Sequence, residues 1–169
     1  MRAALVLAFL ANLALAMLAL TVGPEKLATH FGAGGEPDGW SSGTANALMM
    51  GGISLLLFVM FYGAPNLLRR IPDAWINLPH REYWLAPQRR EHTVVVMARE
   101  LYAIGAATFA LMFVLGTLAL QANLSDPVRL RMDWTWGVTG LYLAYTVYWC
   151  VKLYLGFRLP TSPETGDAG

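Results

Sequence analysis

The sequence predicts an all-α integral membrane protein with four transmembrane helices packed as a small bundle. Three observations lead to this fold class: the composition, four long apolar stretches, and an uneven placement of basic residues. Of the 169 residues, 56% are hydrophobic and 14% are charged, whereas soluble domains carry about 25% charged residues. The length allows a single domain. One cysteine, Cys150, excludes an internal disulfide and a cysteine-rich metal site, and its apolar surroundings predict a buried position.

The four apolar stretches are each long enough to cross a bilayer, which takes about 20 helical residues. The predicted spans are residues 3–22, 44–64, 94–121 and 134–157. None alternates polar and apolar residues as a half-buried strand would. The first resembles a secretory signal, but its apolar run is longer than a typical signal core, so we expect a retained anchor. Residues 1–158 then form one membrane domain, and residues 159–169 form a polar tail.

Basic residues predict the orientation, because Lys and Arg are retained on the cytoplasmic side of a membrane. Four crossings place nine basic residues on the same side as the two ends and the loop 65–92, and three on the same side as the loop 23–43. Both termini and the loop 65–92 are therefore predicted to be cytoplasmic. Tryptophans agree with the boundaries, with Trp40, Trp134 and Trp136 at the outer interface.

Small and polar residues within the spans predict helix contacts. Gly51, Gly52, Ser54 and Gly105 would let backbones approach closely. Asn12 lies near the middle of the first span, and we expect its amide to face the bundle interior or another protein.

The fourth span carries aromatic side chains at helical spacing, at Tyr142, Tyr145 and Trp149. They could line a groove for a pigment, quinone or lipid, but packing or interface anchoring is the preferred interpretation. Lys152 lies near the cytoplasmic boundary and can extend its ammonium to water. The centres of the spans hold no ionisable residue, which argues against coupled transport.

The outer loop, residues 23–43, is rich in glycine and proline and is predicted to be compact and turn-rich. Residues 36–39 suit a type I turn, with proline second and glycine fourth. His30, Glu36 and Asp38 could bind a metal, but their spacing fits no standard ligand pattern, so no metal is predicted. The candidate partner-binding residues in this loop are His30, Phe31, Glu36, Asp38 and Trp40.

The same loop contains the pattern P-x-K-x-x-x-H-F-x-x-x-G-x-P-D-G-W, formed by Pro24, Lys26, His30, Phe31, Gly35, Pro37, Asp38, Gly39 and Trp40. Between two membrane helices, it resembles the uncharacterised extracytoplasmic domain at the start of Sdp-type immunity proteins. Those bacterial membrane proteins protect a cell from its own secreted toxin and can signal the toxin to a repressor. The resemblance covers about the first third of the chain, and longer immunity proteins carry further spans. It implies a multi-pass protein of the bacterial inner membrane, with a secreted peptide toxin or a cytoplasmic regulator as partner.

The inner loop, residues 65–92, interleaves arginines with aromatic residues, which is typical of a segment on an anionic leaflet. Nucleic-acid binding uses similar residues, but the prolines and the attachment to membrane helices favour lipid headgroups or a protein partner. No nucleophile or cofactor motif accompanies His80 and Glu82, so neither a catalytic residue nor a cofactor is predicted. The candidate lipid- or partner-binding residues are Arg69, Arg70, Trp75, Arg81, Tyr83, Trp84, Arg89 and Arg90.

The function predicted from these features is non-enzymatic protein–protein contact, most simply of the immunity or signalling type. Membrane lipids and other membrane proteins are the expected partners, and nucleic acid is not. One alternative is an accessory or structural subunit of a larger inner-membrane complex, respiratory or photosynthetic. Another is a small membrane enzyme or transporter, which would need convergent polar side chains at membrane depth.

Overall fold

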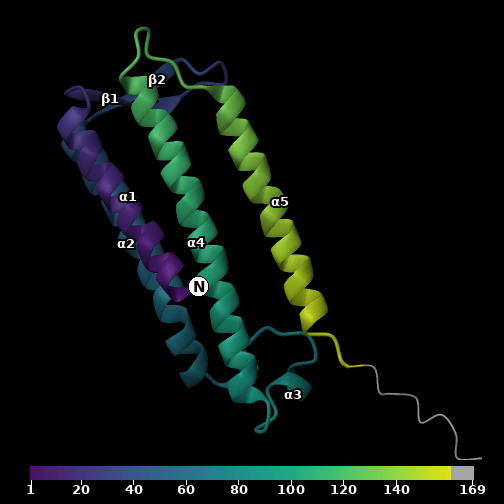
Figure 1. Cartoon of the computed structure of the whole chain (residues 1–169). Coiled ribbons are helices and arrows are strands. Elements are labelled where there is room, and N and C mark those ends of the chain that lie inside the picture. The colour runs from purple at the N-terminus through teal and green to yellow at the C-terminus, as the bar shows by residue number, and fades with distance from the viewer. Residues whose placement is uncertain (161–169) are drawn as a thin grey trace, which may run out of the picture.

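The computed structural model describes residues 1–160, so most of the predicted tail, residues 161–169, lies outside the described residues. Four long helices occupy the four predicted spans (Figure 1). They are α1 (Arg2–Val22), α2 (Gly43–Arg70), α4 (Arg90–Asn123) and α5 (Met132–Gly156). The connections contain β1 (Lys26–Phe31), β2 (Pro37–Ser42), the 3₁₀ turn η1 (Asp73–Trp75) and α3 (Arg81–Trp84).

Three of the long helices, α1, α2 and α4, are long and apolar enough to cross a membrane. This finding suggests a membrane protein. The helix α5 is not among these three, and tyrosine, tryptophan, threonine and glycine are interspersed with its aliphatic residues.

The bundle consists of three helices with a fourth at its side, rather than four helices around one core. Helices α1, α2 and α4 pack against one another, and α5 lies along α4, on the side away from α1 and α2 (Figure 1). The core contains Leu5, Phe9 and Phe109, and the Phe9 ring stacks on Phe58 with centroids 4.2 Å apart. No residue of α5 is buried. The predicted four-helix bundle is therefore not what the structure shows, and Cys150 is exposed rather than buried.

The small residues of the spans behave differently from one another. A Cβ on Gly105 would lie 2.7 Å from Cγ of Phe61 and 3.0 Å from Cδ1 of Leu5, so a larger residue would separate α4 from its neighbours. Gly51 and Gly52, in contrast, have no atom within 4 Å of such a Cβ. The prediction of a close contact is confirmed at Gly105 and wrong at Gly51 and Gly52.

Asn12 faces the interior, as predicted. Its side-chain amide donates to the carbonyl oxygens of Ala8 and Phe109, both at 2.9 Å. Because the second bond reaches α4, the amide links α1 to α4 at membrane depth, where water cannot supply a partner.

The stretch of residues 23–43 forms an antiparallel hairpin, so the all-α prediction is wrong for this segment. The predicted type I turn at residues 36–39 is also wrong, because Pro37 begins β2. The chain reverses at residues 32–36 instead, where Gly32 N–H donates to the Glu36 carbonyl at 2.8 Å and Gly35 N–H to the Gly32 carbonyl at 2.9 Å. Gly35 has φ of +86°, a conformation that glycine adopts without strain. Because Gly35 can adopt this positive φ, the chain reverses before Pro37 and not at residues 36–39.

At the opposite end of the bundle, the stretch of residues 65–92 is largely folded. Residues 65–70 continue α2, and a second small core contains Ile76, Leu78, Leu85 and Phe157. Trp84 Nε1 donates to the Phe157 carbonyl at 2.7 Å, so the end of α5 is attached to α3. We refer to this end as the α3 end and to the other as the hairpin end (Figure 1).

The aromatic side chains of α5 agree with the packing interpretation. Tyr142, Tyr145 and Trp149 are all partly buried, whereas Tyr148 and Tyr154 are exposed. The Tyr142 hydroxyl lies 2.9 Å from the Thr108 hydroxyl of α4. The predicted stripe therefore marks the side of α5 that faces α4.

Candidate functional site

The hairpin is fixed to the helices by one asparagine at the end of α4. The Asn123 Oδ1 accepts from the Ala28 N–H at 2.6 Å, and its Nδ2 donates to the carbonyls of Ala28 at 3.0 Å and Ala119 at 2.9 Å. Asn123 and Ala28 are both buried. Because this amide pairs with both backbone groups of Ala28, it substitutes for a neighbouring strand.

The tip of the hairpin is fixed by the connection between α4 and α5. Leu130 N–H donates to the Gly35 carbonyl at 2.9 Å, and Arg129 donates to the Gly34 carbonyl at 3.1 Å and pairs with Glu36 at 2.9 Å. A Cβ on Gly35 would lie 2.4 Å from the Leu130 carbonyl oxygen, so only glycine fits at that position. The hairpin is thus held at both its base and its tip.

His30 and Asp38 form the most prominent polar pair of the hairpin. The His30 Nδ1 and the Asp38 Oδ1 lie 2.5 Å apart, with side-chain exposures of 75% and 53%. His30 stands opposite Gly39, where a Cβ would lie 2.9 Å from the His30 Cβ. The absence of a side chain at Gly39 therefore gives the His30 side chain the room it occupies.

The other predicted residues of this loop are placed apart from that pair. Glu36 binds Arg129, Phe31 is paired with Pro37, and Trp40 is paired with Ala28 while remaining 52% exposed. Within residues 1–160, no three His, Cys, Asp or Glu side chains gather as a metal site would require. The structure brings His30 and Asp38 together but does not bring Glu36 to them.

One carboxylate near the hairpin end has a shifted pKa. The backbone N–H of Trp134 lowers the pKa of Asp133 below its usual range, and Arg131, 3.1 Å away, acts in the same direction. Asp133 lies in the first turn of α5, where a negative charge is favourable.

A cavity of about 430 Å³ lies between α1, α2 and α4, directly beneath β1. Asn12 and Ser54 line the part of the cavity that is farthest from the hairpin. Leu27 and Ala28 of β1 line the part nearest to it. This cavity was not predictable from the sequence, because it depends on the distance between helices that are remote in sequence.

At the α3 end, Arg90 holds the end of α2 in place. Its guanidinium donates to the carbonyls of Leu68, Arg69 and Ile71 at 3.3–3.5 Å and pairs with Asp73 at 2.8 Å. Helix ends leave carbonyls without intrahelical partners, and a positive charge there is favourable. Arg90 therefore has a structural role in addition to any predicted binding role.

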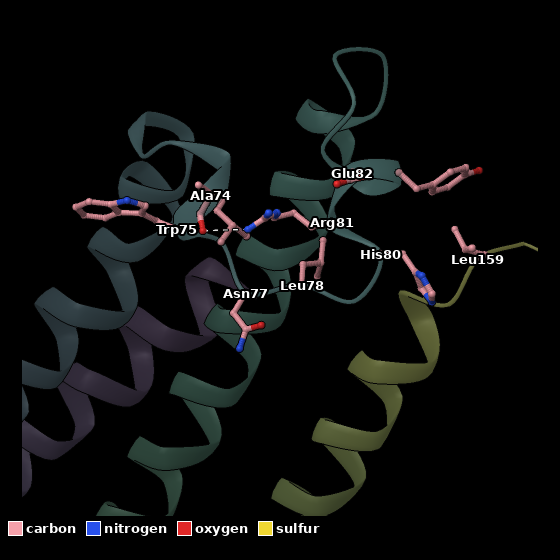
Figure 2. A pocket seen from close by; sticks show the side chains of 10 residues that line it. Ala74, Trp75, Asn77, Leu78, His80, Arg81, Glu82 and Leu159 are labelled. Carbon is pink, nitrogen blue, oxygen red and sulfur yellow. Dashed lines mark hydrogen bonds between the residues drawn. The ribbon is translucent and has the colours of Figure 1, made fainter.

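Two further arginines of the predicted set also contact the protein itself. Arg89 donates to the Tyr83 carbonyl at 2.7 Å and lies 3.8 Å from the Tyr83 ring centroid. Arg81 donates to the Ala74 carbonyl at 3.1 Å, across an open cavity of about 630 Å³ (Figure 2). Arg69, Arg70 and Trp75 are exposed and face outward from this folded segment.

Figure 2 shows His80 and Leu159 together at the end of α5, on the far side of this cavity from Trp75. His80 has φ of +51°, which is uncommon for a residue with a side chain. The cavity is shallow, and its polar groups come from one short segment, so we regard it as part of the surface of the α3 end rather than as a catalytic cleft.

An ion pair that sequence reasoning missed joins α4 to α5. Lys152 Nζ lies 2.9 and 3.0 Å from the two carboxylate oxygens of Glu100, whose side chain is 7% exposed. The signal available in the sequence was that Glu100 and Lys152 fall at matching depths in antiparallel spans. The Lys152 side chain is 48% exposed, so its ammonium binds Glu100 while the side chain still reaches the surface of the protein.

A family model described as a domain of unknown function, DUF1648, matches residues 7–55, which comprise most of α1, the hairpin and the first part of α2. No curated protein and no solved structure matches the chain. The matched segment contains the hairpin residues and every cavity residue that α1, β1 and α2 contribute.

Proposed function

We propose that this protein is a non-enzymatic membrane protein of the immunity or signalling type, which binds a peptide or protein partner through its hairpin. The observation that carries the proposal is the His30–Asp38 pair, exposed on a hairpin that α4 holds through Asn123 and the α4–α5 connection holds at its tip. A rigid surface with exposed polar and aromatic groups suits recognition, because little conformational entropy is lost on binding.

The proposed orientation places the hairpin outside a bacterial inner membrane and the α3 end in the cytoplasm, with α5 as a fourth span. The support is the excess of basic residues at the α3 end. Trp134 and Trp136, at the start of α5, are 53% and 65% exposed, as interface tryptophans would be. Accessibility labelling of single cysteines introduced at Ala33 and at Asn77 tests this orientation, in a Cys150→Ser background.

The hairpin proposal is tested by His30→Ala and Asp38→Asn variants, with Glu25→Gln as the matched control. Glu25 is an exposed carboxylate at the base of the same hairpin. A strain that lacks the protein would be challenged with culture supernatant of its parent strain, and survival would be measured with each variant expressed. We expect the wild type and Glu25→Gln to protect, and the two hairpin variants to fail while remaining inserted in the membrane. Equal protection by all variants would contradict the proposal.

A second candidate function is an accessory subunit of a larger membrane complex. The observation that favours it is α5, which has no buried residue and exposes Leu141, Val147, Tyr148 and Tyr154. Purification in a gentle detergent followed by mass spectrometry tests this candidate. Stoichiometric recovery of large membrane subunits would favour it, and recovery of the chain alone would favour the first proposal.

We also propose that the α3 end binds anionic lipid through the exposed side chains of Arg69, Arg70 and Trp75. The support is that Arg81, Arg89 and Arg90 are already occupied within the protein. Replacing Arg69 and Arg70 with glutamine should reduce enrichment of phosphatidylglycerol around the purified protein, in a salt-sensitive manner. Salt-independent enrichment that survives both substitutions would exclude this role.

A further inference from the structure

The cavity beneath the hairpin has the lining of an apolar binding site. Eighteen residues line it, and none of them carries a charge. Most are aliphatic or methionine, including Leu15, Met49, Ile53, Met112 and Leu115. Its volume of about 430 Å³ falls within the range of about 300–1,000 Å³ that is common for small-molecule sites.

The buried amides of the cavity are already bonded within the protein. The Asn12 Nδ2 donates to Ala8 and Phe109, and the Asn123 amide pairs with Ala28 and Ala119. A polar guest or an ion would lose its hydration without gaining these groups as partners. The cavity also contains one buried hydroxyl, that of Ser54, so it favours an uncharged and largely apolar guest.

The cavity lies at a defined depth. Its residues belong to the half of α1, α2 and α4 that adjoins the hairpin, and these are the three helices apolar enough to cross a membrane. Thr29 is exposed and Asn46 is half-buried, and both stand where α2 begins beside β1. A guest therefore meets polar groups at the hairpin end and apolar groups further in.

We infer that this cavity binds one acyl chain of a membrane phospholipid, with the lipid headgroup near Thr29 and Asn46. Phospholipid is the apolar chain present at the highest concentration around helices in a bilayer, so mass action favours it over other apolar guests. An acyl chain would also supply the van der Waals contacts that the lining of an empty apolar cavity lacks. This inference does not depend on the hairpin having a protein partner.

The experiment uses the full-length protein in nanodiscs whose phospholipid carries a diazirine near the middle of one acyl chain. After irradiation, mass spectrometry locates the labelled residues. We expect label at Met50, Met112 and Leu115, which line the cavity and are partly buried, well above label at Leu141 and Val147 on the exposed side of α5. The same lipid with its diazirine on the headgroup should label Thr29 or Asn46 and not the interior residues.

Cavity-filling substitutions with matched controls complete the test. Ala119→Leu and Ala16→Leu add volume inside the cavity, whereas Ala110→Leu and Ala14→Leu add the same volume on exposed positions of the same two helices. We expect the first pair to lower interior labelling several-fold and the second pair to leave it unchanged. Thermal unfolding of each variant identifies any variant that has not folded. If one cavity-filling variant is unfolded, the labelling of the other one, on the other helix, tests the inference.

Three results would overturn the inference. The first is interior labelling no stronger than on the exposed side of α5, which would mean general contact with lipid. The second is interior labelling that the folded cavity-filling variants leave unchanged. The third is interior labelling by the headgroup probe, which would mean that the guest is not held by its chain. Loss of toxin protection in the hairpin variants has no bearing on these readouts, so the two proposals fail separately.

Discussion

Lys152 of α5 donates to both carboxylate oxygens of Glu100 in α4, and this ion pair joins the peripheral helix to the bundle. Glu100 is buried, whereas the Lys152 side chain is 48% exposed. No residue of α5 is buried, so apolar packing alone gives α5 little attachment. The remaining polar contacts described between α5 and the bundle are those of Tyr142 with Thr108 and of Phe157 with Trp84. Electrostatics therefore has an unusually large share in positioning α5.

Lys152→Gln should loosen α5, because it leaves the Glu100 carboxylate buried without its main partner. Removal of one partner from a fully buried pair costs about 3–5 kcal/mol. Because Lys152 is half exposed, we expect a smaller loss of unfolding free energy, on the order of 2 kcal/mol. Thermal unfolding in detergent, followed by tryptophan fluorescence, measures the loss, since Trp149 lies in α5.

The matched control is Arg99→Gln. Arg99 also contacts Glu100, at 3.4 Å, but its side chain is 63% exposed, so its removal should change stability by less than about 1 kcal/mol. A double variant, Glu100→Gln with Lys152→Gln, should recover part of the loss because no unpaired charge remains. Equal effects of the two single variants would mean that the ion pair does not hold α5.

The helices were predictable from the sequence because their signal is local. Each apolar run is continuous, and the helices α1, α2, α4 and α5 begin and end within a few residues of the predicted spans, apart from the extension of α2 through Arg70. The interior position of Asn12 was also predictable, since an amide at membrane depth needs a partner.

The hairpin and the bundle arrangement were not predictable in the same way. The strand β1 pairs with β2 and is held by Asn123, whose position beside Ala28 depends on how α4 packs. The turn prediction at residues 36–39 failed because a local proline signal competed with Gly35, whose positive φ and contact with Leu130 depend on a remote segment. The exposed His30–Asp38 pair was predicted as a set of candidate residues but not as a contact.

Gly35→Ala should weaken the attachment of the hairpin tip. An alanine at φ of +86° is strained by about 1–3 kcal/mol, and its Cβ would collide with the Leu130 carbonyl oxygen. Gly32→Ala is the control, because the nearest atom to its Cβ would be 3.7 Å away, an ordinary contact. Limited proteolysis of the intact protein should therefore cut residues 32–36 faster in Gly35→Ala than in Gly32→Ala. Identical cleavage rates would show that the tip is not held as described.

Arg90→Gln should unfold the segment that follows α2. The guanidinium contacts three carbonyls and Asp73, and hydrogen bonds that involve a charged group contribute about 1.5–3 kcal/mol each. Because the three carbonyl contacts are long, at 3.3–3.5 Å, we count mainly the 2.8 Å bond to Asp73 and expect a stability loss of about 2 kcal/mol, with faster chymotryptic cleavage at Trp75 and Tyr83. Arg70→Gln removes an exposed arginine from the same helix end and should change stability by less than about 0.5 kcal/mol. Similar behaviour of the two variants would mean that charge alone, rather than the contacts of Arg90, stabilises this end.

Asn123→Ala should detach the hairpin from α4, because it leaves the N–H and the carbonyl of Ala28 buried without their partner. Each unsatisfied buried group costs about 1–3 kcal/mol, so a loss of roughly 2–6 kcal/mol is expected for the two groups. Gln121→Ala is the control, since Gln121 is an exposed amide two residues earlier in the same helix. Hydrogen exchange measured by mass spectrometry should show the Ala28 amide losing protection in Asn123→Ala only. Retained protection would mean that β2 and the helix ends hold β1 without Asn123, and the hairpin would then be held mainly at its tip.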